Sequence, residues 1–302
     1  MNLLLSFPML LLFPTLGAAE WHVLQILMII TAVVVLYCFV VGEVTRNNSQ
    51  VDKLWSLLPI VYVWIITWYG HFSPRLVIMA ALVTLWGVRL TYNFALKGAY
   101  HWRFWSGVED YRWQVLRANK LLQPHWKFML FNLLFISLYQ NVLILLFTLP
   151  AFEAYRYDQT PLGWLDCVAA GLMLFFIIYE TVADVQQWRF QSKKWALIHS
   201  GKPLESLEEP YCKGFLTTGL WAHSRHPNYF AEQAIWLSFY VFSIAAGAPI
   251  FNWTLLGAVL LVLLFQGSST FGESLSASKY PAYKDYKKNV SKFIPYLKCK
   301  KK

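Results

Sequence analysis

Charged residues are scarce in this chain of 302 residues. They make up 14% of it, whereas 57% of the residues are hydrophobic and 18% are aromatic. Soluble domains typically contain about 25% charged residues, so this composition excludes an ordinary soluble domain and a disordered chain. Cysteine is also rare, with four residues and no CxxC spacing. This scarcity argues against a disulfide framework and a zinc site, and we expect no metal.

Familiar nucleotide-binding and hydrolase motifs are missing as well. The sequence contains no GxGxxG, GxxxxGK[ST], HExxH or GxSxG, which argues against Rossmann, P-loop, zincin and nucleophile-elbow enzymes. The net charge is +10, but the basic residues lie in loops between apolar blocks. That distribution is typical of membrane topology, so we expect membrane lipids rather than nucleic acid as partners.

The apolar residues gather into blocks long enough to span a bilayer, which requires roughly 20 residues. The sequence therefore predicts an all-α, polytopic membrane helix bundle, with spans over 23–42, 54–70, 76–96, 128–150, 162–183, 229–248 and 251–269. An eighth block, 3–18, is shorter and is interpreted as a signal sequence or an extra membrane helix. No basic residue precedes it, which favours the membrane helix. The predicted organisation is an N-terminal segment 1–20, a helical membrane domain 21–296 and a basic tail 297–302.

Lysine and arginine are distributed unevenly between the loops. Segments 97–127, 183–228 and 270–302 carry six, six and nine of them, whereas 71–75 and 151–161 carry one each. The positive-inside rule then predicts a cytosolic C-terminus. The tail, with Lys298 and Lys300, resembles the dilysine retrieval signal of the endoplasmic reticulum. A basic anchor on anionic headgroups is the alternative.

Ionisable residues in apolar blocks are costly and therefore indicate function. They are Asp52, Arg89, Glu180, Asp184 and Glu232, and an ion-pair network that fixes helix packing is the alternative. Asp166 is expected to reach water instead. Glu180, Asp184 and Gln187 share one helical stripe, which an amphipathic exit from the membrane would also produce.

The densest polar motif is Ser224-Arg225-His226-Pro227-Asn228-Tyr229, followed by Glu232. Proline suits the first turn of a helix, and an arginine fork suits phosphate. Asn228 and Glu232 are four residues apart and share one helix face, and an asparagine can both donate to and accept from a carboxamide. Near the end of the chain, Tyr283 can stack on a ring or bind a phosphate, or belong to an interfacial aromatic belt.

Gly219-Leu220-Trp221 with this motif resembles the C-terminal domain of steroid 5-alpha-reductases, and most closely a poorly characterised branch grouped with them. The ending Glu273, Tyr283, Tyr286 and Phe293-Ile294-Pro295 is similar to the tail of the same family. The motif also resembles membrane sterol C14 and C7 reductases. The resemblance implies a seven-helix fold, NADPH, and hydride transfer to a C=C conjugated with a ketone in a steroid-like or other apolar lipid.

The resemblance also implies roles for individual residues. Asn228 would bind the nicotinamide carboxamide and Glu232 would support it. Asp52 lies where the reductases have a glutamate near the ketone. Trp86 replaces the tyrosine that assists that glutamate, so Tyr92 is the alternative catalytic phenol. The rest of the predicted cofactor site is Asp184, Arg189, Arg225, His226 and Tyr283.

Two other interpretations stay open at this point. Isoprenylcysteine carboxyl methyltransferases, which use S-adenosylmethionine, share the RHPxY pattern. A non-catalytic membrane scaffold or lipid carrier would retain the fold without holding NADPH.

Overall fold

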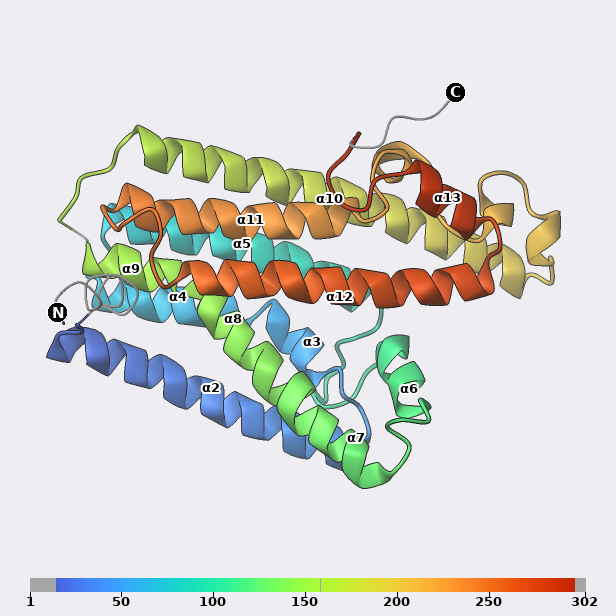
Figure 1. The fold of residues 1–302 in the computed structure, drawn as a ribbon, viewed down its shortest axis with the longest axis horizontal. Helices are drawn as coiled ribbons and strands as arrows, with labels where there is room; N and C mark the ends of the chain where they lie inside the picture. Colours follow the sequence, from blue (N-terminus) through green and yellow to red (C-terminus); the bar gives the residue numbers. More distant parts are fainter. Residues whose placement is uncertain (1–14, 158, 297–302) are drawn as a thin grey trace, which may run out of the picture. The chain divides into compact units, whose positions relative to one another are not determined.

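The computed structural model describes residues 15–157 and 159–296, and it is built from helices (Figure 1). Within these residues the only β interaction is an isolated parallel bridge between Ser224 and Ser291. Most of the predicted N-terminal block and all of the lysine-rich tail lie outside the described residues.

In the described part of the chain, six helical stretches are long and apolar enough to cross a membrane. They coincide with six of the seven predicted spans, and they support a multi-pass integral membrane protein. The seventh predicted span, 229–248, is also helical, as α11 (Pro227–Ala245). It is not one of the six, because Asn228, Glu232 and Gln233 interrupt its apolar residues. The six stretches are Ala18–Thr45, Gln50–Tyr69, Pro74–Leu96, His125–Arg156, Trp164–His199 and Leu255–Lys279.

The chain divides into two compact units. Unit 1 contains the described residues up to Gly171 together with Trp236–Leu261. Unit 2 contains Leu172–Ile235 and the described residues from Val262 onward. The boundaries fall inside three helices, α10 (Trp164–His199), α11 and α12 (Leu255–Lys279), so each of these helices contributes one end to each unit.

In unit 1, α4 packs against α5, α8 and α9, and α2 packs against the π-helical stretch η1 and against α8 (Figure 1). α7 also packs against η1. These elements of unit 1 are α2 (Ala18–Thr45), α4 (Leu58–Tyr69), α5 (Pro74–Leu96), α7 (His125–Phe131), η1 (Asn132–Tyr139), α8 (Gln140–Thr148) and α9 (Pro150–Arg156).

Large aromatic side chains fill the core of unit 1. Trp86 on α5 is fully buried, and its ring meets the ring of Trp236 edge-on with centroids 4.9 Å apart. Trp236 in turn lies 4.1 Å from the ring of Phe147. Such pairs are worth about 0.5–1.5 kcal/mol beyond the area that they bury. Trp86 is therefore a core packing residue.

A buried lysine holds the irregular segment that follows α5. Lys53 lies on the short helix α3 (Gln50–Trp55) and is fully buried. Its Nζ donates to the carbonyl oxygens of Phe104 and Ser106, at 2.7 and 2.6 Å. Because carbonyl groups away from water need donors, this ammonium fixes the segment that leads to α6 (Tyr111–Arg117).

A buried ion pair connects the start of α5 to the start of α10. Arg75 Nε and Nη2 donate to the two carboxylate oxygens of Asp166, at 2.7 and 3.0 Å. The same guanidinium also donates to the carbonyl oxygens of Thr160, Pro161 and Ala245. Asp166 is only 3% exposed. Our expectation that it reaches water was therefore wrong: the arginine compensates for the loss of hydration.

Replacing Asp166 tests this pair. Asp166→Asn leaves the charge of Arg75 buried without a counterion, which typically costs about 3–5 kcal/mol. We expect a clearly lower melting temperature of the detergent-purified protein. The matched control is Asp285→Asn, because Asp285 pairs with Lys288 where both side chains are exposed and such pairs contribute little. Equal melting temperatures for the two variants would contradict the assignment.

Candidate functional site

The polar motif of unit 2 begins at a tight turn that leads into α11. The turn is a short 3-10 helix, η4 (Gly219–Ala222), and Gly219 has a φ of 63°. A Cβ at this position would lie 2.6 Å from the side chain of Gln186, so the close approach requires glycine. Gln186 Oε1 accepts from the N–H of Leu220 at 3.0 Å, and Trp221 Nε1 donates to the carbonyl of Ala183 at 3.0 Å. The loop is thus fixed to α10 immediately before the motif.

Arg225 connects this loop to the last part of the described chain. Its Nε donates to Glu273 Oε1 at 2.7 Å, and its Nη1 donates to the carbonyls of Lys287 and Val290 at 2.8 and 2.5 Å. Glu273 also meets Lys287 Nζ at 3.0 Å and His226 Nε2 at 3.1 Å. Arg225 is only 6% exposed. We call Arg225, His226, Glu273 and Lys287 the arginine clamp.

The backbone beside the arginine clamp is paired as well. The N–H groups of Arg225 and His226 donate to the carbonyls of Ser291 and Lys292, at 2.8 and 3.1 Å. The hydroxyl of Tyr286, on α13 (Tyr283–Asn289), donates to the carbonyl of Trp221. These contacts hold α13 and the residues after it against the start of α11.

Tyr283 is buried in the same region. Its ring meets the ring of Phe215 edge-on at 4.9 Å and the ring of Tyr286 at 5.6 Å. For Arg225 and Tyr283, which were predicted to bind cofactor, these observed contacts are with the chain itself. They orient the loop that leads into α11, the helix that carries Asn228.

A second polar group of unit 2 contains unsatisfied acceptors. Asn228 Nδ2 donates to Asp184 Oδ1 at 3.2 Å, and this bond fixes the orientation of the amide. Asn228 Oδ1 and Gln187 Oε1 are buried, and neither has a hydrogen-bond partner among the described residues. A buried acceptor without a donor costs about 1–3 kcal/mol. Both oxygens are therefore suited to a ligand that brings N–H or O–H groups.

The other predicted cofactor residues of unit 2 lie on the same two helices. Glu232 is one turn after Asn228 on α11 and is buried. Arg189 is exposed on α10, between Asp184 and the lysines at 193 and 194. The structure thus brings Asp184 and Asn228 into contact and leaves Arg189 open to solvent.

The two predicted catalytic residues belong to unit 1. Asp52, on α3, accepts from Trp113 Nε1 at 2.8 Å and is half-buried. Tyr92, on α5, is 66% exposed. Trp113 was not identified as a partner from sequence, because nothing in the sequence predicts which indole of this tryptophan-rich chain meets Asp52.

The family comparison covers most of the chain. A model of the family described as "Protein of unknown function (DUF1295)" matches residues 38–290. An uncharacterized protein of Schizosaccharomyces pombe is 38% identical over 281 residues, which cover 87% of this chain and 78% of that protein. No solved structure matches the chain. The matched range includes every residue of the two polar groups described above.

The arginine clamp can be tested by removing the charge of Glu273. Glu273→Gln keeps the shape of the side chain but leaves Arg225 buried without its carboxylate, which we expect to cost about 3–5 kcal/mol. Limited proteolysis should then cleave the segment that contains α13 faster than in the unchanged protein. Glu209→Gln is the control, because Glu209 forms an exposed pair with Lys213. Unchanged proteolysis would show that the clamp does not hold this segment.

The protonation of His226 makes the stability of the folded protein depend on pH. Burial lowers the pKa of His226 below its ordinary value of 6.5. The hydrogen bond to Glu273 raises this pKa, but burial has the larger effect, and the charges of Arg225 and Lys292 lower it further. The unfolded chain then binds a proton more readily than the folded one. The resulting stabilisation is complete above about pH 6.5 and is lost as the pH falls towards the folded-state pKa. We expect the melting temperature to decrease from about pH 7 to about pH 5, with a shallower decrease in His226→Gln than in the control His199→Gln.

Proposed function

The chain belongs to the DUF1295 family, and from its own residues we propose that it is a membrane-embedded, NADPH-dependent reductase. The proposed reaction transfers hydride to a conjugated C=C of a hydrophobic, steroid-like or lipid-like enone. The family includes steroid 5-alpha-reductase-like proteins, which agrees with the resemblance of the motif 224–229 and Glu232.

One observation carries the proposal: the buried and unpartnered Oδ1 of Asn228. The bond from Nδ2 to Asp184 assigns the other end of this amide as an acceptor. A nicotinamide carboxamide carries an N–H donor and a carbonyl acceptor, so it would supply the missing donor to Asn228. The second buried acceptor, Gln187 Oε1 on α10, is proposed to accept a hydrogen bond from a ribose hydroxyl. The residues present therefore fit the cofactor.

We assign the remaining residues of unit 2 by their exposure. Arg189 is open to solvent and is proposed to bind cofactor phosphates, since a guanidinium fork matches phosphate oxygens. Asp184 and Glu232 are proposed to orient Asn228 from two helices. Arg225 and His226, in the loop before α11, and Tyr283, on α13, are proposed to support this site through the contacts described above.

NADPH, when bound, would supply the hydride. Hydride addition to the β-carbon of an enone places negative charge on the ketone oxygen, and a donor to that oxygen lowers the barrier most in a dry site. We propose Asp52, in its protonated form, as this donor. Tyr92 is the alternative phenol, since Trp86 has no hydroxyl and is committed to the core.

We further propose that the protein resides in the endoplasmic reticulum with a cytosolic C-terminus. The support is the excess of lysine and arginine in segments 97–127, 183–228 and 270–302. NADPH would then be taken from the cytosol and the substrate from the membrane.

Cofactor binding is the direct test. Titration of the detergent-purified protein with NADPH should raise its melting temperature, because a ligand that binds only the folded state stabilises it by mass action. Asn228→Leu removes the acceptor with little change in volume and should abolish the shift. Ser192→Ala, at an exposed position of α10, should retain it.

The same assay separates the alternatives. A shift with S-adenosylmethionine but not with NADPH would replace the proposal with methyl transfer, and no shift with either would favour a scaffold. Asp52→Asn should keep the NADPH shift while slowing NADPH oxidation in the presence of a 4-en-3-one steroid. An unchanged rate in this variant would remove Asp52 from the mechanism.

A further inference from the structure

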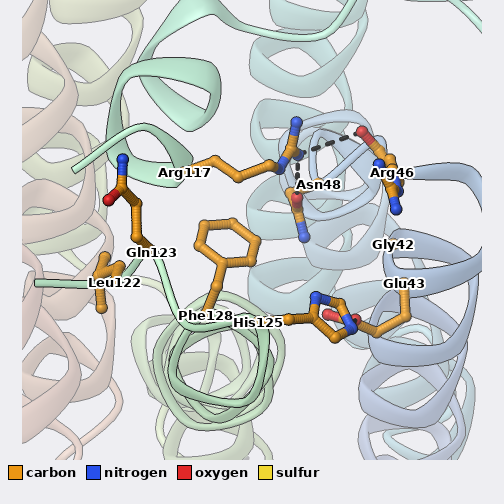
Figure 2. Close-up of a pocket in the computed structure, with 9 residues that line it drawn as sticks. All are labelled: Gly42, Glu43, Arg46, Asn48, Arg117, Leu122, Gln123, His125 and Phe128. Carbon is orange, nitrogen blue, oxygen red and sulfur yellow. Dashed lines mark hydrogen bonds and ion pairs between the residues drawn. The ribbon is translucent and has the colours of Figure 1, made fainter. Parts of the chain in front are cut away.

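A separate cavity lies in unit 1, at the end of α2 and the start of α7. Its volume is about 130 Å³, far more than the roughly 10–15 Å³ that one water molecule needs. Figure 2 shows its polar side chains around the aromatic ring of Phe128. The lining residues are Gly42, Glu43, Arg46, Asn48, Arg117, Leu122, Gln123, His125 and Phe128.

Asn48 points an unused donor into this cavity. The residue is 2% exposed, and its Oδ1 accepts from Arg117 Nη2 at 2.6 Å, which fixes the orientation of the amide. Its Nδ2 is buried and has no hydrogen-bond partner in the described chain. In Figure 2 this nitrogen faces the space bordered by Gly42, His125 and Phe128. A buried N–H group without an acceptor is costly, so a molecule in the cavity that offers oxygen atoms would satisfy it.

Cationic side chains are available at the cavity. Two guanidinium groups, Arg46 and Arg117, line it against a single carboxylate, Glu43. The Glu43 carboxylate accepts from Asn132 Nδ2 at 2.7 Å and lies 3.7 Å from His125 Nε2, and it keeps its negative charge. Arg117 shares its charge with Glu109, outside the cavity. The charge of Arg46, which is exposed, is left to meet an incoming anion.

The cavity also lies at the ends of two long apolar helical stretches. Arg46 follows directly after α2, and His125 begins the stretch that continues through α7; both stretches are apolar enough to cross a membrane. Positions at the ends of such spans lie near the lipid headgroups. Leu122 and Phe128 add apolar surface beside the charged groups.

We propose that this cavity binds the phosphate group of a membrane phospholipid. The phosphate oxygens would accept from Asn48 Nδ2 and from the guanidinium of Arg46, as charge-assisted bonds to phosphate favour. The apolar part of the lipid would lie along Leu122 and Phe128. A soluble phosphate would use the same donors, and the experiment distinguishes the two sources.

The test compares ligands that differ by one group. The detergent-purified full-length protein is titrated with phosphatidic acid, with diacylglycerol of the same acyl chains, and with inorganic phosphate, while its melting temperature is recorded. We expect phosphatidic acid to raise the melting temperature and diacylglycerol to leave it unchanged. Stabilisation by inorganic phosphate to the same extent would support the phosphate site and assign it a soluble ligand instead.

Two variants address the donors directly. Arg46→Gln should raise the midpoint concentration of phosphatidic acid about tenfold, the usual effect of losing one charged hydrogen bond. Asn48→Asp keeps the acceptor for Arg117 but replaces the free donor with a carboxylate oxygen, and should abolish the shift.

Lys120→Gln is the matched control, because Lys120 is an exposed cation of the same segment outside the cavity. It should bind as the unchanged protein does. Equal stabilisation by phosphatidic acid and diacylglycerol, or an unchanged midpoint in Arg46→Gln, would overturn the proposal. Neither result depends on NADPH binding.

Discussion

Lys53, Arg75, Lys194 and Arg225 are buried cations, and each donates to backbone carbonyl oxygens of an irregular segment. Carbonyl groups outside helices must find donors when water is excluded, and in a membrane protein the cost of failing is several kcal/mol for each group. Lys53, Arg75 and Arg225 each donate to two or three carbonyl oxygens, and Lys194 donates to the carbonyl oxygen of Gly214. The loops of both units depend on this interaction, because their residues form no sheet in the described structure.

The four cations differ in how their charge is balanced. Arg75 is paired with the buried carboxylate of Asp166, and Arg225 with that of Glu273. Removing either carboxylate therefore leaves a buried arginine without a counterion. Lys53 and Lys194 instead lie beside aromatic rings, at 5.5 Å from Phe104 and 5.2 Å from Trp195. Cation–π contacts of this kind contribute most when water is excluded. The arginine sites are thus less tolerant of substitution at the partner than the lysine sites are.

The helices could be predicted from the sequence because their signal is local. Six apolar blocks match candidate spans, although α10 continues to His199, well beyond the predicted end at 183, since a helix need not end where its apolar residues end. The spacing of Asp184 and Gln187 also predicted their shared stripe on α10. Their relation to Asn228 could not be derived in this way, because it depends on how two helices pack. The role of Arg225 could not be predicted either, since two of its acceptors are the backbone carbonyls of Lys287 and Val290, which leave no trace in the side-chain pattern.

The arginine clamp has a consequence for biosynthesis. It joins Arg225 to residues 287–292, which lie more than 60 positions later in the sequence. During translation, α10, α11 and α12 have therefore all been synthesised before the carbonyl acceptors for Arg225 exist. Until then Arg225 must remain hydrated or hold another partner, since an unpaired guanidinium cannot enter an apolar interior at acceptable cost. The loop before α11 therefore reaches its final structure only after these helices have been made, and it is open to misfolding or proteolysis in the meantime.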